Sequence, residues 1–147
     1  MKNKQQKNTK GDHKEEFNLN FDVKELISAW VVMWNSYDLS LVDQLFLTDS
    51  RVIYFSSEKE GLIKGINTIR EHHKGFGFVE GGKVQSNKLW VEDLHTIMYG
   101  PVGLVTGVWY FRRGEKDTGK TQHGAVTIVY VQTGNEYRIA HMHFANY

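Results

Sequence analysis

Apolar residues recur at three- and four-residue steps between Phe21 and Tyr37, which is the period of an amphipathic α-helix with a wide buried face. The recurring positions are Val23, Leu26, Ile27, Trp30, Val31, Trp34 and Tyr37. Asn20 or Asp22 can cap the start of this helix, because a short polar side chain accepts a hydrogen bond from the first free N–H groups. The pattern therefore predicts one long helix near the start of the chain.

Two shorter helices are predicted after it. The first opens at Asp38 or Ser40, carries Leu41, Leu45 and Phe46 on its apolar side, and ends at residues 48–50. Another follows a β-branched, aromatic strand at 51–56 and a polar turn at 57–61, and it runs from 66 to about 74. Ile66, Ile69 and His73 share one side of it, and the glycines between 75 and 82 break it.

From residue 84 onward the chain is extended almost throughout. Four long strands are predicted at 89–99, 102–112, 122–132 and 137–144, with turns at Gly100-Pro101, 114–119 and Gly134-Asn135 between them. Consecutive hairpins give an antiparallel meander. Helices followed by a run of strands predict an α+β domain in which helices cover one face of a curved sheet.

The final strand carries the most informative chemistry. Simple alternation puts His141 and His143 on one face with Tyr137 and Ile139, and puts residues 138, 140, 142 and 144 on the other. Two imidazoles on one face suit a metal site joined by His95 or His123, an acid/base site, or structural histidines that bond neighbouring strands or lie in a dimer interface. We expect no metal, because no cysteine is present and no carboxylate converges on the pair.

Composition narrows the class of protein. The 147 residues suit a single domain, predicted at 17–147, after a polar tail at 1–16 whose composition is that of a disordered segment. The net charge of +1 arises in that tail, so no basic stripe indicates a nucleic acid or an anionic membrane. Zero cysteines exclude disulfides and thiol catalysis.

No apolar run is long enough for a membrane helix, and the N-terminus has no apolar core of a signal peptide, so a cytoplasmic protein is the default expectation. A chain that follows a removed signal peptide has the same appearance.

Three segments stand out as local motifs: Asn35-Ser36-Tyr37-Asp38-Leu39 with Asp43-Gln44-Leu45-Phe46, Gly61-Leu62-Ile63-Lys64-Gly65-Ile66 with Ile69-Arg70, and Tyr137-Arg138-Ile139-Ala140-His141-Met142-His143. In their order and spacing they resemble the NTF2-like superfamily, which includes SnoaL-like polyketide cyclases, ketosteroid isomerase and the association domain of calcium/calmodulin-dependent kinase II. The resemblance implies a cone, in which a curved antiparallel sheet wraps around the first helix, with two further helices. It also implies a pocket inside the cone and homodimers formed through the outer sheet face.

The resemblance does not carry over the catalytic residues of ketosteroid isomerase. Its first-helix tyrosine aligns with Trp30 and its catalytic aspartate with Tyr54, and neither replacement supplies the same chemistry. The kinase association domain has an arginine directly after its His-x-His, where this chain has Phe144, and a second one where this chain has Ile128. An anion pocket of that kind is therefore not expected.

Two functions stay open. The first is a small-molecule-binding protein with a largely apolar pocket, an isomerase, cyclase or dehydratase if it is an enzyme, with candidate catalytic residues Tyr54, His95, His141 and His143. The expected pocket lining is Trp30, Tyr54, Trp109, Ile128, Tyr130, Met142 and Phe144, with no cofactor. The second is a non-catalytic association module, which the absence of the family's catalytic carboxylates favours.

Overall fold

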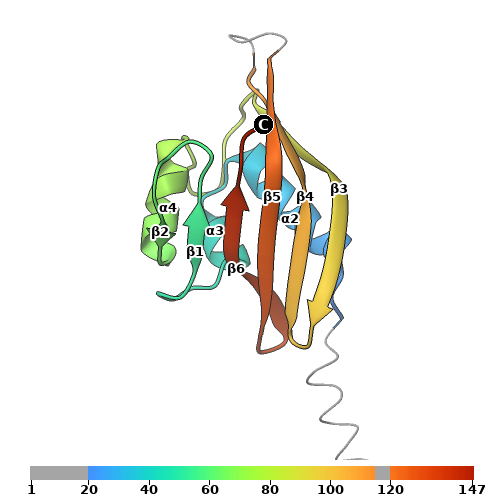
Figure 1. Ribbon diagram of the computed structural model, residues 1–147. Helices are drawn as coiled ribbons and strands as arrows, with labels where there is room; N and C mark the ends of the chain where they lie inside the picture. Colours follow the sequence, from blue (N-terminus) through green and yellow to red (C-terminus); the bar gives the residue numbers. More distant parts are fainter. Residues whose placement is uncertain (1–19, 115–119) are drawn as a thin grey trace, which may run out of the picture.

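The structure is a computed structural model that describes residues 20–114 and 120–147 (Figure 1). The predicted tail at 1–16 lies outside the described residues. The helices are α2 (Val23–Ser36), α3 (Ser40–Leu45) and α4 (Ile66–Gly75), and the strands are β1 (Ile53–Phe55), β2 (Ile63–Lys64), β3 (Lys88–Tyr99), β4 (Val102–Arg112), β5 (Thr121–Thr133) and β6 (Glu136–Phe144).

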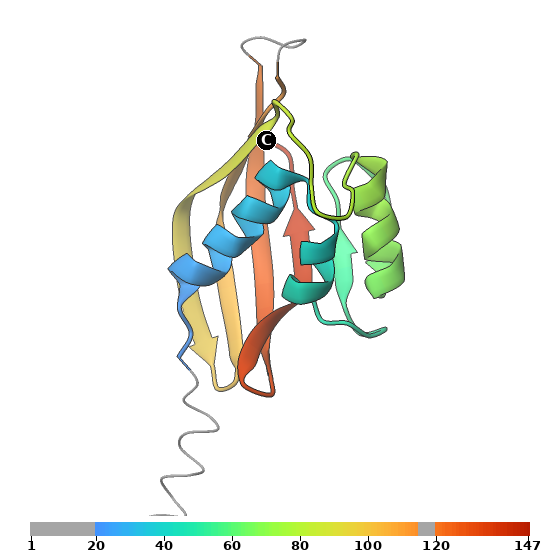
Figure 2. The same cartoon turned by 180° about the vertical axis from the view of Figure 1, so that it is seen from behind.

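Six strands form one sheet in the order β2-β1-β6-β5-β4-β3. The four long strands are the predicted antiparallel meander, and β1 extends it by pairing in parallel with β6 and antiparallel with the short strand β2. Figure 2 shows α2 lying across the inner face of the sheet, with α3 and α4 beside it near β1 and β2. The predicted α+β cone is confirmed.

Helix α2 begins and ends at residues suited to those positions. The Asp22 side chain accepts a hydrogen bond of 3.2 Å from the backbone N–H of Glu25, which caps the N-terminus. Tyr37 ends the helix in the left-handed conformation, with φ of 54°. This strained position is held from both sides, because the Tyr37 ring stacks on Phe78 and its hydroxyl accepts a hydrogen bond of 2.8 Å from Asn87.

The hydrophobic core lies between α2 and the sheet. Trp30 and Met33 are fully buried, whereas Val32 on the opposite side of the same helix is 56% exposed. The Trp30 ring packs on Phe144 of β6, with 5.8 Å between the ring centroids. The first helix therefore buries the apolar face that its three- and four-residue period predicts.

A β-bulge in β6 changes which residues face inward. Tyr130 pairs with Ile139 but Val129 pairs with His141, so Ala140 is an extra residue that the partner strand does not match. Ile139 and Met142 are consequently both buried, although strict alternation would put them on opposite faces. The expectation that His141 and His143 share a face with Tyr137 and Ile139 is therefore wrong.

A second irregularity bends β3. The register shifts between Glu92 and His95, and Asp93 adopts a φ of 56° there. Bulges increase the local twist and bend of a strand. This bend helps the outer strands to curve around α2. Among the described residues, no helix is both long and apolar enough to cross a membrane.

Candidate ligand pocket

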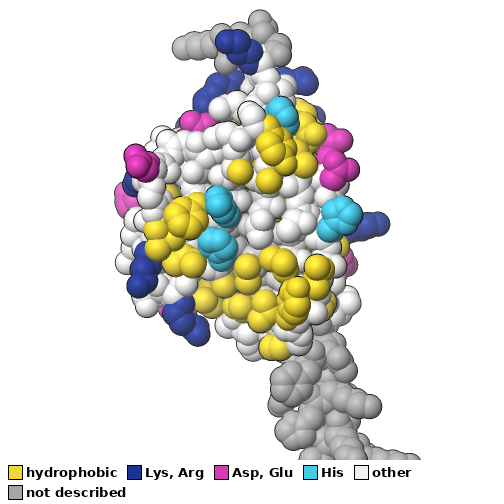
Figure 3. All heavy atoms as spheres, in the orientation of Figure 1, with side chains coloured by type: hydrophobic (Ala, Val, Ile, Leu, Met, Phe, Trp, Pro, Cys, Tyr) yellow, Lys and Arg dark blue, Asp and Glu magenta, His cyan; other side chains and the backbone are white. Residues whose placement is uncertain are grey.

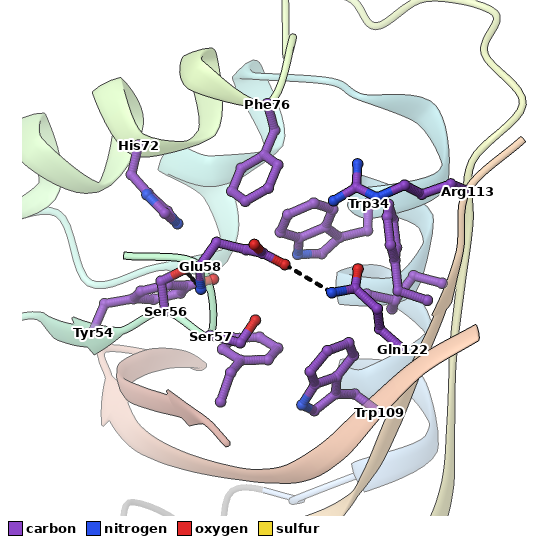
Figure 4. A pocket seen from close by; sticks show the side chains of 13 residues that line it. Trp34, Tyr54, Ser56, Ser57, Glu58, His72, Phe76, Trp109, Arg113 and Gln122 are labelled. Carbon is purple, nitrogen blue, oxygen red and sulfur yellow. Dashed lines mark hydrogen bonds between the residues drawn. The ribbon is translucent and has the colours of Figure 1, made fainter. Parts of the chain in front are cut away.

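One hollow opens between α2, α4 and the inner face of the sheet (Figure 4). Its lining residues come from both halves of the chain and are Trp34, Tyr54, Ser56, Ser57, Glu58, His72, Phe76, Leu89, Trp109, Phe111, Arg113, Gln122 and Phe144. The walls surround about 410 Å³ of space, counting the part that is open to solvent.

Aromatic rings make most of the wall, and they hold one another in place. Trp34 on α2 contacts Phe76, Phe78 and Phe111 edge to face, with centroid separations of 5.2, 5.0 and 6.3 Å. On the opposite side, the Trp109 indole N–H donates a hydrogen bond of 2.9 Å to the carbonyl oxygen of Ala145. Because these rings are locked by packing, the apolar part of the hollow is already formed without a ligand.

Two buried nitrogen atoms in this wall have no hydrogen-bond partner among the described residues: Nε1 of Trp34 and Nε2 of His72. Trp34 is 6% exposed, and its indole nitrogen is a donor only. His72 is half-buried, and burial lowers the pKa of its imidazole, with a smaller contribution from the charge of Lys59. The ring is therefore neutral near pH 7 and can give or take a hydrogen bond according to its tautomer.

Glu58 supplies the one carboxylate among the lining residues, from the turn after β1. It accepts a hydrogen bond of 3.1 Å from Nε2 of Gln122 on β5, and Figure 4 shows this bond crossing the hollow between the two sides. The turn is fastened from below, because Asn146 donates a hydrogen bond of 3.0 Å to the carbonyl oxygen of Ser57.

Arg113 follows the last residue of β4 and lies on the same side of the hollow as Trp34 (Figure 4). Its guanidinium carbon lies 5.5 Å from the centre of the Phe111 ring, a cation-π distance. No ion pair among the described residues involves either Arg113 or Glu58. Within the described part of the chain, the hollow therefore carries one charge of each sign that is free of ion pairs.

Three of the seven residues predicted to line a pocket lie in this wall: Tyr54, Trp109 and Phe144. The other four, Trp30, Ile128, Tyr130 and Met142, are at most 1% exposed, lie in the core and are not among the residues that line the hollow. Burial raises the pKa of the Tyr54 hydroxyl, so this group stays protonated and serves as a hydrogen-bonding group and not as a base.

The three candidate histidines do not join Tyr54. His95, His141 and His143 lie on the outer face of the sheet, on β3 and β6. Nδ1 of His141 lies 3.1 Å from the carbonyl oxygen of Ile53, and the His143 ring packs on Phe55 with 5.2 Å between centroids. Figure 3 shows histidines beside hydrophobic patches on this face. His141 thus bonds a neighbouring strand, one of the alternatives that the sequence leaves open.

The sequence analysis missed the serines of the wall, Ser56 and Ser57, and all four wall residues with a charged, imidazole or amide side chain: Glu58, His72, Arg113 and Gln122. The pair His72-His73 is visible in the sequence, and successive helix positions face different directions, so one ring packs inward and the other can reach the pocket. No local pattern marks Glu58, Arg113 or Gln122. Among the described residues, no group of three or more histidine, cysteine, aspartate or glutamate side chains is placed to hold a metal ion.

Comparison with known proteins agrees with the fold. The model of the SnoaL-like domain matches residues 23–145. A putative calcium/calmodulin-dependent protein kinase II association domain from Xanthomonas campestris is similar, with a TM-score of 0.71, 14% identity and 85% of each chain covered. A putative ketosteroid isomerase from Parabacteroides distasonis has a TM-score of 0.66 and 21% identity over 88% of this chain and 92% of the other.

An NTF2-like superfamily protein from Salmonella enterica has a TM-score of 0.67 and 23% identity, over 84% of this chain and 87% of the other. The search of curated proteins finds no match. At these identities, the structural likeness carries the fold alone. The family model covers most of the chain, and the chain therefore belongs to the family of SnoaL-like domains, with the NTF2-like fold.

Proposed function

We propose that this SnoaL-like protein binds a small, largely apolar molecule in the hollow between α2, α4 and the sheet. The observation that carries the proposal is a wall of packed aromatic rings that contains two buried nitrogen atoms, Trp34 Nε1 and His72 Nε2, for which the described residues supply no partner. A buried polar atom without a partner loses free energy that a bound group restores. Apolar walls with a few polar atoms are the usual form of a ligand site.

The same hollow contains groups that can move a proton. Neutral His72 can accept one, and the Glu58 carboxylate lies across the same space. Isomerase, cyclase and dehydratase reactions all require such a transfer. The expected catalytic set of Tyr54, His95, His141 and His143 is replaced in this proposal by Tyr54, His72 and Glu58, because these three lie around one space and the three histidines of the expected set lie on the outer sheet face.

The second candidate function is an association module that forms a homodimer through the outer sheet face. Ile97 and Tyr99 are 51% and 59% exposed there, and the residues paired with them on β4, Leu104 and Val102, continue the apolar surface. The putative kinase II association domain among the similar structures also supports this candidate. The absence of the family's catalytic carboxylates no longer favours this candidate, because Glu58 places a carboxylate in the wall of the hollow.

Thermal unfolding with a panel of small apolar and aromatic ligands tests the first function. A ligand that binds only the folded state stabilises it by mass action, by about 2.7 kcal/mol at a hundred times Kd. We expect stabilisation of the wild-type protein and of His143→Ala on the outer face, and none in Gln122→Trp, whose indole would fill the hollow. Equal behaviour of all three proteins, or no stabilisation together with a dimer that buries His143, contradicts ligand binding.

A further inference from the structure

The free charges at the hollow define the class of ligand more narrowly, if the hollow is the ligand site proposed above. Arg113 and Trp34 both contact the ring of Phe111, at 5.5 Å from the guanidinium carbon and 6.3 Å between ring centroids. The Trp34 N–H is buried and has no partner, and Arg113 takes part in no ion pair among the described residues. One side of the hollow thus offers an indole donor and a cation.

The opposite side offers acceptors. His72 packs on Tyr54 at 5.4 Å and on Phe76 at 5.1 Å, and its Nε2 is buried without a partner in the described ranges 20–114 and 120–147. In Figure 4 the His72 ring and Trp34 lie on opposite sides of the hollow, and the carboxylate of Glu58 lies between them. A ligand group near His72 and Glu58 has to donate a hydrogen bond, because a carboxylate only accepts.

Seven of the thirteen residues around the space carry rings: Trp34, Tyr54, His72, Phe76, Trp109, Phe111 and Phe144. A planar aromatic ring fills such a space with stacking and edge contacts, and it loses little conformational freedom on binding. A bare anion is a poorer ligand, because Glu58 repels it and it leaves the apolar faces of the rings without contacts. An aromatic ring with an anionic group at one end and a hydrogen-bond donor at the other pairs with the donors on one side of the hollow and with the acceptors on the other.

We infer that the hollow binds a small aromatic carboxylate with a hydroxyl group opposite the carboxylate. The carboxylate accepts hydrogen bonds from Arg113 and from the indole N–H of Trp34. The hydroxyl donates to Nε2 of His72 or to Glu58, in exchange for the bond that Glu58 now accepts from Gln122. This arginine differs in position from the arginines of the kinase association domain, whose places hold Ile128 and Phe144.

Four matched probes separate the two ends of the ligand. Para-hydroxybenzoate has both groups, para-methylbenzoate only the carboxylate, para-cresol only the hydroxyl, and para-xylene neither. We expect calorimetric titration of the full chain to give the highest affinity for para-hydroxybenzoate, about tenfold lower affinities for para-methylbenzoate and para-cresol, and the lowest for para-xylene, because each hydrogen bond to a charged group is worth about tenfold.

Adjacent arginines provide the control. Arg112 points to the outer face, with its guanidinium carbon 5.6 Å from the centre of the Trp90 ring, whereas Arg113 points into the hollow. Arg113→Gln is expected to weaken both benzoates about tenfold and to change para-cresol less than twofold, and Arg112→Gln is expected to change neither. Glu58→Gln is expected to strengthen para-methylbenzoate, because it removes the repulsion.

Equal affinities for all four probes, or equal losses in Arg112→Gln and Arg113→Gln, would overturn the ligand class and leave an apolar binding site intact. Binding of none of the four probes contradicts the ligand class and the proposed binding function together.

Discussion

The carboxylate of Glu58 accepts a hydrogen bond from Nε2 of Gln122, which lies 64 residues further along the chain, at a distance of 3.1 Å. The bond joins the turn after β1 to the start of β5 across the hollow (Figure 4). Both side chains are accessible to solvent, so the bond contributes little to stability. Because the bond spans the hollow, we predict that a ligand enters by breaking it.

Gln122→Ala is therefore expected to speed ligand entry. We predict a several-fold higher association rate for para-cresol, with a change in the free energy of unfolding below about 0.5 kcal/mol, the usual range for surface substitutions. Stopped-flow tryptophan fluorescence measures the rate, because Trp34 and Trp109 line the hollow. Gln132→Ala, near the other end of the same strand, is the control, and an unchanged rate in Gln122→Ala would show that ligands enter elsewhere.

Much of the fold could be predicted from the apolar pattern. The long helix expected over 21–37 is α2 at Val23–Ser36, and the helix expected at 66–74 is α4 at Ile66–Gly75. These elements bury one face each, so their period is written in the sequence. The short strand β2 was not predicted, since its two residues have too little pattern to identify.

The inward face of β6 could not be predicted, because a bulge is a backbone event that leaves no residue signature. Ala140 is compatible with a regular strand, yet the extra residue there moves Met142 and Phe144 onto the same face as Ile139. The sequence does not reveal for another reason that Glu58 lines the hollow. Its position there depends on bonds to Gln122 and from Asn146 to the Ser57 carbonyl, which join residues far apart in the sequence.

We expect the protein to lose stability in mild acid because of the buried imidazole of His73. The ring is fully buried among Trp34, Phe46, Tyr54 and Phe78, and its Nδ1 donates a hydrogen bond of 2.8 Å to the carbonyl oxygen of Ile69. Nε2 has no partner among the described residues, so a proton there would place a charge in aromatic surroundings. Burial, with a smaller contribution from the neighbouring His72, lowers the pKa of His73 to about 4.

The unfolded chain binds a proton at His73 near pH 6.5, whereas the folded protein resists this proton down to about pH 4. The contribution of neutral His73 to stability is therefore fully present above pH 6.5, and the free energy of unfolding falls by roughly 3 kcal/mol as the pH drops to 4. Asp38 and Asp49 have lowered pKa values and act only below this window. Urea unfolding from pH 7.5 to 4 measures the slope.

His73→Leu is the matched variant, because it keeps an apolar group of similar size in the core. We expect it to flatten the slope between pH 6.5 and 4, and His72→Gln to remove only a minor part, since His72 is half-buried with its pKa lowered in the same direction. A slope that is unchanged in His73→Leu would assign the acid sensitivity to other groups.

The C-terminal segment packs directly against Gly124, so its position requires a residue without a side chain there. A Cβ atom at this position of β5 would overlap the carbonyl oxygen of Ala145, which accepts the Trp109 N–H bond. Ala145 also donates a backbone bond of 2.9 Å to Ala125, so the segment cannot move without breaking the bond. We expect Gly124→Ala to cost about 1–3 kcal/mol, the usual range for overpacking.

Gly75→Ala is its control. A Cβ atom there meets nothing within 4 Å, and alanine suits the end of α4 better than glycine does. Chemical denaturation should show a loss only in Gly124→Ala, together with a change in Trp109 fluorescence. Equal stability of the two variants would mean that the segment after β6 is not tightly docked.

The outer sheet face predicts self-association. Ile97 on β3 lies opposite Leu104, and the row continues through Val129 to His141 of β6. Ile97 is 51% exposed, so the apolar row is open to solvent in a single chain. A second copy could cover it, and a lysine at the centre of the covered area would be buried without a partner. We therefore expect Ile97→Lys to weaken the dimer at least about tenfold, as is typical when an interface centre is disrupted. Sedimentation equilibrium measures the effect.

Leu62→Lys is the control, because Leu62 is equally exposed but lies beside β2 at the far edge of the sheet. A wild-type protein that stays monomeric, or equal weakening by both lysines, would remove this face as the dimer interface, while ligand binding in the hollow on the other side of the sheet would be unaffected.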